Sequence, residues 1–222
     1  MAEAAVTWGT TTKFGTVTGW NPIGATINKT AERKVAMDGI GNEVASTTVN
    51  EGSTFSQEFQ AASTSAPTIP PVLGKLVGSC ILTGISITTK GSDFAKMTLT
   101  GHQHEDNAHA DTLNQVTHGI TMSSGFGGID FLGGTAGDAA TVESSTLNIQ
   151  CGHTDSPGDD GNHYVGQNHT ANATASTTWL GVPSVGIGEG WDKIETGTTV
   201  ESNTNHVRTT YGGAKSLTLA AP

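Results

Sequence analysis

Hydrophobic and polar residues alternate with a period of two in several stretches of the chain, and this alternation predicts β-strands. Residues 80–104 show the pattern most clearly. Two alternating segments flank a glycine-containing turn at 90–93, which predicts a β-hairpin. The positions expected on one face are Ile81, Thr83, Ile85 and Ile87 before the turn, and Ala95, Met97 and Leu99 after it.

A second hairpin is predicted over residues 32–50, where two alternating segments flank a turn at Gly39-Ile40-Gly41. It opens with the basic pair Arg33 and Lys34, and most of its side chains are small. It has no cluster of large apolar side chains to bury beneath it. We therefore expect this hairpin to pack against other copies of the same chain.

Further strands are predicted in the second half of the chain. Their alternation is shorter, and turn residues bound each of them. They are residues 141–153, with Leu147 and Ile149 on one side, residues 175–181, and a closing strand pair over 206–221, with Leu217 and Leu219 facing one way.

Residues 105–121 form the best helix candidate. Asp106 or Asn107 can cap its start, two apolar residues lie at helical spacing, and Gly119 can end it.

Composition favours strands over helices elsewhere. Threonine and serine are abundant, leucine and lysine are scarce, and 30 of the 222 residues are glycine. We predict a mainly β fold, a sandwich or barrel with long hairpins and at most one or two short helices. A single domain is expected over 1–222, with an N-terminal arm at about 1–30 and long loops near 60–75, 101–140 and 153–173.

The net charge is −10, from 20 acidic and 10 basic residues. Apart from Arg33 and Lys34 the basic residues are scattered singly, so no basic patch exists for specific binding of nucleic acid. Two cysteines, Cys80 and Cys151, are too few for a disulfide framework and favour a reducing compartment. The N-terminus does not read as a signal peptide, and no apolar run approaches the ~18 residues of a membrane span. We expect synthesis in a cytoplasm and no contact with membranes.

Histidines are the main candidates for metal chemistry. His102 and His104 are two residues apart, which places both side chains on one face of a strand. Glu105, Asp106 or Asp111 could add a carboxylate ligand. The competing interpretation, polar histidines in turns or at subunit contacts, is favoured because the sequence offers little large apolar lining for a buried site.

Other catalytic and cofactor motifs are missing from the sequence. The acidic stretch with Asp155, Asp159 and Asp160 lacks the ligand spacing of a helix-loop-helix calcium site. There is no Gly-x-Ser-x-Gly elbow and no phosphate-binding glycine loop before a helix. We predict no enzymatic activity and no cofactor.

The order of these elements resembles the tail tube proteins of tailed bacteriophages and related contractile injection tubes. The resemblance is carried by "AERKVAMDGIGNEVASTTVNEG" at 31–52, by the hairpin at 80–104, and by the stretch from "ESSTLNIQ" to "STTWLG" at 143–181. It is a likeness of pattern over most of the chain.

This resemblance implies a structural protein of the virion tail, made in the host cytoplasm. Its copies would form hexameric rings that stack into a hollow tube, contact other tail proteins, and let DNA pass without specific binding. Strands of each copy would line the channel, whose surface should be neutral or negative. Arg33 and Lys34 would pair across a seam with Glu43 or Glu51 of the next copy. The expected assembly contacts are Arg33, Lys34, Asp38, Glu43 and Glu51.

Three alternatives remain open at the level of the sequence. Another β-rich virion protein, such as a capsid decoration or baseplate protein, would share this composition. A carbohydrate-binding β-sandwich could use Trp8, Trp20, Trp179 and Trp191 to stack on sugars. A metal-dependent enzyme could be built on His102 and His104.

Overall fold

The computed structural model describes residues 14–78, 80–104, 114–133, 141–157, 163–183, 188, 190–201 and 206–220. Among these residues the chain is all-β and contains no helix. The mainly β fold expected from the sequence is therefore confirmed. The strands are β1 (Trp20–Met37), β2 (Glu43–Ala61), β3 (Val72–Leu73), β4 (Leu76–Val77), β5 (Cys80–Lys90), β6 (Lys96–His104), β7 (Val116–Thr117), β8 (Thr141–Pro157), β9 (His163–Leu180), β10 (Lys193–Glu201) and β11 (His206–Leu217).

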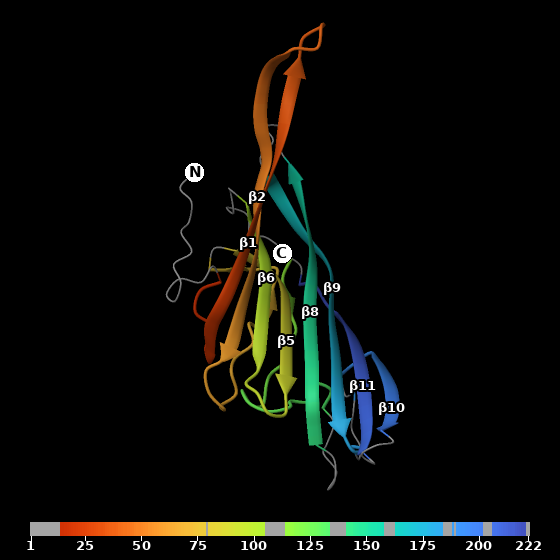
Figure 1. The fold of residues 1–222 in the computed structure, drawn as a ribbon. Helices are drawn as coiled ribbons and strands as arrows, with labels where there is room; N and C mark the ends of the chain where they lie inside the picture. Colours follow the sequence, from red (N-terminus) through yellow and green to blue (C-terminus); the bar gives the residue numbers. More distant parts are fainter. Residues whose placement is uncertain are drawn as a thin grey trace.

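One large antiparallel sheet contains most of these strands (Figure 1), in the order β1-β2-β6-β5-β8-β9-β11-β10. Strand β4 pairs with the first residues of β5, and β3 pairs with β7 in a separate two-stranded sheet. Four hairpins follow one another through the large sheet, namely β1–β2, β5–β6, β8–β9 and β10–β11. Both hairpins predicted from the clearest alternation, 32–50 and 80–104, are present.

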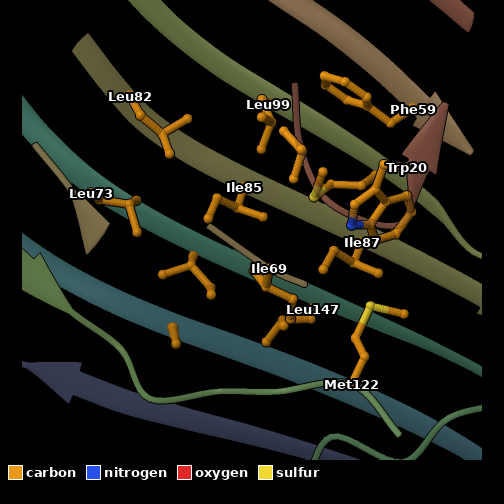
Figure 2. Packing of buried hydrophobic residues seen from close by; sticks show 14 of the residues in the cluster. Trp20, Phe59, Ile69, Leu73, Leu82, Ile85, Ile87, Leu99, Met122 and Leu147 are labelled. Atoms are coloured by element: carbon orange, nitrogen blue, oxygen red, sulfur yellow. The ribbon is translucent and has the colours of Figure 1, made fainter. Parts of the chain in front are cut away.

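One face of the sheet is apolar and lies beneath the segments that connect the strands. Figure 2 shows Ile69 and Met122 from these segments packed against Ile87 and Leu147 of the sheet. Hydrophobic burial on this face is the main source of the fold's stability. The buried sheet residues are Phe55, Phe59, Met97, Leu99, Ile85, Ile87, Leu147, Ile149, Ala173 and Ala175, and the covering residues include Phe14, Val17, Ile69, Leu73, Met122, Ile129 and Leu132.

The opposite face of the sheet, called the open face below, carries hydroxyl and amide side chains. Adjacent strands place these residues side by side, because the register aligns them across the sheet. One row contains Glu58, Thr98, Ser86, Asn148, Thr174 and Ala214, and the next contains Gln60, Lys96, Thr88, Thr146, Ser176 and Gly212.

Because of a β-bulge, the first residues of β5 lie on the opposite face of the sheet from the one predicted. Strand β6 pairs Gly101 with Leu82 and Thr100 with Gly84, so Thr83 is the extra residue on β5. The bulge moves Leu82 to the core face, in line with Ile85, whereas Ile81 packs separately against Leu76. Strict alternation placed Ile81 with Ile85, and that prediction was wrong.

The predicted helix at 105–121 is not found in its described part. Val116 and Thr117 form strand β7 and pair with β3; residues 105–113 lie outside the described residues. Leu73 and Val116 are both fully buried, so burial against the sheet decides this segment's conformation rather than helical spacing.

Three predicted boundaries also need correction. The expected loop at 153–173 is mostly strand, because β8 continues to Pro157 and β9 begins at His163. Strand β1 begins at Trp20, inside the expected N-terminal arm of about 1–30. Within the expected loops near 60–75 and 101–140, β2 extends to Ala61 and β6 to His104, with β3 and β7 farther along.

Candidate assembly surfaces

The β1–β2 hairpin extends far beyond the sheet. The two strands pair from Trp20 and Ala61 to Met37 and Glu43, whereas β2 pairs with β6 only between Gly52 and Gln60. Residues 31–51, called the arm below, therefore form a ribbon of two strands that projects from one end of the molecule (Figure 1). An isolated two-stranded ribbon is marginally stable in water.

A tight turn closes the arm at its tip. The Asp38 carboxylate accepts hydrogen bonds from the backbone N–H groups of Ile40, at 3.0 Å, and Asn42, at 2.8 Å. The Asn42 side-chain amide donates to the same carboxylate at 3.1 Å. The hydrogen bonds from Asn42, from its backbone above all, lower the pKa of Asp38. Gly41 completes the turn with φ +91°, a conformation that glycine adopts without strain. Asp38 thus has a structural role in the turn.

The charged residues of the arm pair within one chain. Arg33 bonds to Glu43 across the hairpin, and Lys34 bonds to Glu32 along its own strand. Arg33 and Glu43 are therefore partners within one hairpin, and their predicted pairing across a seam between copies stays a prediction. Both pairs are exposed and contribute little to stability. Residues 32–44, called the tip below, carry three carboxylates, those of Glu32, Asp38 and Glu43, and two cations. The net charge of the tip is therefore −1. The side chain of Glu51, the remaining predicted contact, lies outside the described residues.

Large apolar side chains are exposed around the tip. Ile40 is 86% exposed, Val44 64% and Met37 62%, and Val35 is also exposed. Apolar residues gathered at the end of a projecting hairpin indicate a contact surface for another protein. The alternation of the two strands does not single out these four residues as exposed. An isoleucine between two glycines at a turn apex was the available signal, because turns ordinarily carry polar residues.

The two edges of the sheet are also available for pairing. Every strand along the path is antiparallel to its neighbours, so β1 and β10, at the two ends, run in opposite directions. Exposed edge strands with unpaired backbone groups are templates for pairing with another chain. If a second copy is related to the first by rotation, β1 of one copy can lie alongside β10 of the other, and these two strands would be antiparallel.

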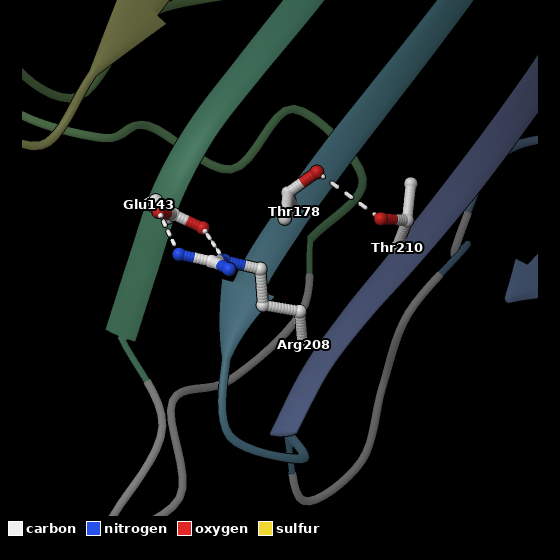
Figure 3. A network of polar contacts seen from close by, with 4 residues as sticks. All are labelled: Glu143, Thr178, Arg208 and Thr210. Carbon is white, nitrogen blue, oxygen red and sulfur yellow. Dashed lines mark hydrogen bonds and ion pairs between the residues drawn. The ribbon is translucent and has the colours of Figure 1, made fainter. Parts of the chain in front are cut away.

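The open face carries few charges for its size, and they nearly balance. Figure 3 shows one pair at its lower end, where Arg208 donates to both carboxylate oxygens of Glu143, at 2.6 and 3.0 Å. Beside it, the Thr178 and Thr210 hydroxyls share a hydrogen bond of 3.1 Å. Counting the described side chains, the face has four cations, Lys90, Lys96, Lys193 and Arg208, and three carboxylates, Glu58, Glu143 and Glu195.

His102 lies beside a histidine from another strand. The rings of His102 and His153, from β6 and β8, have centroids 4.2 Å apart. The Nδ1 atom of His153 is 2.6 Å from Oδ1 of Asn168, whose amide donates to the carbonyl of Gly74. Within the described residues no three metal-binding side chains gather at one place. The side chain of His104 and residues Glu105, Asp106 and Asp111 lie outside the described part, so the metal site stays an open alternative to the favoured interpretation.

The tryptophans offer little surface for stacking on sugars. Trp20 and Trp179 are buried, with only 5% and 2% of their surface exposed. Trp191 packs against the core and donates its indole N–H to the carbonyl of Phe131 at 3.2 Å. Trp8 lies outside the described residues. Three of the four predicted sugar contacts are thus used in packing.

Comparison with known proteins adds no assignment: no protein-family model matches the chain, and no curated protein matches it. The described part of the chain holds no helical segment with the length and hydrophobicity that crossing a bilayer requires.

Proposed function

We propose that this protein is a structural subunit that assembles with copies of itself into stacked rings, as the tail tube of a virion. The observation that carries the proposal is the arm, whose apolar tip projects beyond the sheet and has no covering segment within the described chain. A folded protein gains by burying such residues, and burying each one contributes about 1.5–3 kcal/mol. A contact with another protein supplies that burial.

The sheet edges support a ring. Because β1 and β10 run in opposite directions, repetition by rotation continues the antiparallel pattern from one copy to the next. Such a contact joins two different edges, so it closes into a ring when the rotation returns to the first copy. Closure pairs the two edge strands of the large sheet, β1 and β10, and this reduces an aggregation hazard.

The open face supports the proposed passage of DNA. Its hydroxyl and amide groups bond readily to water, and among the described side chains its four cations are nearly offset by three carboxylates. A channel lined in this way would offer no cluster of cations to hold phosphates. The acidic excess of the chain lies largely outside this face.

Negative-stain electron microscopy of the purified full chain tests this function. We expect rings and hollow filaments with a regular axial repeat. Trimers or a single unstacked ring would instead favour a capsid decoration or baseplate protein. A monodisperse monomer over a range of salt and protein concentrations would contradict self-assembly altogether.

A further inference from the structure

One exposed apolar side chain, that of Phe126, also lies at the end of the molecule opposite the arm. The turn after β5 and the segment near Phe126 meet there, and the Phe94 and Phe126 rings pack edge to face with centroids 5.1 Å apart. Phe126 is 41% exposed. We call the residues 90–96 and 124–128 the base. In Figure 1 the tip of the arm and the turn after β5 lie at opposite ends of the sheet.

The tip and the base carry opposite net charges. The turn segment of the base, 90–96, has two cations, Lys90 and Lys96, and one carboxylate, Asp93, which gives +1. The tip carries −1. Contact between two tips would bring like charges together, whereas contact between tip and base pairs opposite ones.

We propose that the tip of one copy docks on the base of the next copy, with Ile40 against the exposed Phe126 side chain. This inference rests on the proposed function and names the contact that stacks the rings. The two patches are different surfaces of one chain, so the contact is heterologous and each docking leaves a free tip and a free base. Copies therefore add along the strand direction, as the growth of a tube requires.

Disulfide cross-linking between introduced cysteines tests this contact. One preparation carries Ile40→Cys and the other Phe126→Cys, and the two are mixed and treated with oxidised glutathione. The native thiols Cys80 and Cys151 are buried, so the introduced thiols dominate the reaction. We expect covalent dimers in the mixture. A chain with both substitutions should give a ladder of multimers, because each copy then has both partners.

The matched control replaces Phe126→Cys with Thr146→Cys, an exposed position on the open face. We expect no dimers between this variant and Ile40→Cys. Dimers formed by Ile40→Cys alone would overturn the proposal in favour of a contact between tips.

A second variant, Ile40→Ser, reports on assembly without cross-linking. Ile40 is not buried in the single chain, so the thermal midpoint of the variant protein should match that of the parent protein. We expect the protein concentration needed for filaments to rise about tenfold, with rings still formed. The docking would be refuted, with the tube function left intact, by two results together. The Ile40→Ser variant would form filaments as the parent does, and the cross-linking experiment would give no dimers between tip and base. Failure of the parent chain to form rings or filaments would refute both.

Discussion

His118 follows β7, and its two ring nitrogens have opposite hydrogen-bonding roles. The backbone N–H of Ile120 donates to Nδ1 at 3.0 Å, so Nε2 carries the proton and donates to the carbonyl of Pro70 at 2.7 Å. This arrangement requires a neutral imidazole. The ring is buried, and burial lowers the pKa of His118, while the bond to Pro70 opposes this in part.

The pH dependence of stability follows from this lowered pKa. Because the pKa is lower in the folded chain than in the unfolded one, the neutral ring stabilises the fold above the unfolded value of 6.5, and that stabilisation is lost as the pH falls through the folded value. We expect the thermal midpoint to fall between about pH 7.5 and pH 5.5, and to fall less in His118→Gln. Thermal denaturation monitored by circular dichroism measures both. Identical pH profiles would contradict this role of His118.

At the scale of elements, the core and the arm contribute to different properties. Among the described side chains, all the buried ones lie outside residues 31–51, in the rest of the sheet and the segments that cover it. The described side chains of the arm are exposed or partly exposed, and within the described residues the arm pairs with no third strand. This separation of the arm from the core supports the proposed contact of the arm with other copies.

Shortening the arm separates these two properties. Thr30 and Gly52 face each other across the hairpin, so an Asn-Gly turn can replace residues 31–51. We expect the free energy of unfolding to stay within about 1 kcal/mol of the parent value, because no buried residue is removed. Filament formation should be abolished, as measured by sedimentation. Filaments of parental length from the shortened chain would show that the arm is not required for assembly.

At the scale of the whole molecule, the near-neutral open face bears on how DNA passes a tube. The described side chains of this face sum to one net positive charge per copy, and every further cation is repeated in each copy of a tube. Affinity for DNA then rises and becomes salt-dependent, because each phosphate contact releases counterions.

Lysines on the open face test this view. Thr146 and Thr174 are exposed on the neighbouring strands β8 and β9. We expect filaments with Thr146→Lys and Thr174→Lys to retain DNA at low salt and to release it as salt rises, in a co-sedimentation assay. Filaments with glutamine at both positions provide a control of similar size without charge, and should resemble the parent. Equal retention of DNA by the parent filaments would contradict a non-binding channel.

Local patterns were sufficient to predict the β5–β6 hairpin and the turn of the arm. Alternation of Ala95, Met97 and Leu99 matched a buried face, and these residues are fully buried. The same rule failed at Thr83, because a bulge depends on how a strand pairs with its neighbour. It also failed at the β8–β9 hairpin beyond Cys151. There the two strands pair only with each other and extend beyond the rest of the sheet, so neither face of the hairpin needs apolar residues. A polar sequence of this kind resembles a loop.

The candidate surfaces could be predicted only in part. Residues 32–50 were expected to contact other copies on the basis of their small and charged side chains. The pairing of Arg33 with Glu43 inside the chain depends on the hairpin register, and the exposure of Ile40 depends on how far the arm projects. The alternation pattern does not give the register, and the projection of the arm depends on where the neighbouring strand β6 ends.

The sequence by itself determined the all-β class and the main hairpins, because alternation and turn residues act over a few neighbouring positions. Tertiary structure decided the order of the strands, the face that is covered, and the length of the arm that remains unpaired. These depend on contacts between segments far apart in the chain, such as β5 with β8 and β2 with β6. Burial of one sheet face beneath the connecting segments selects that arrangement, and it leaves the open face, the edges and the tip exposed.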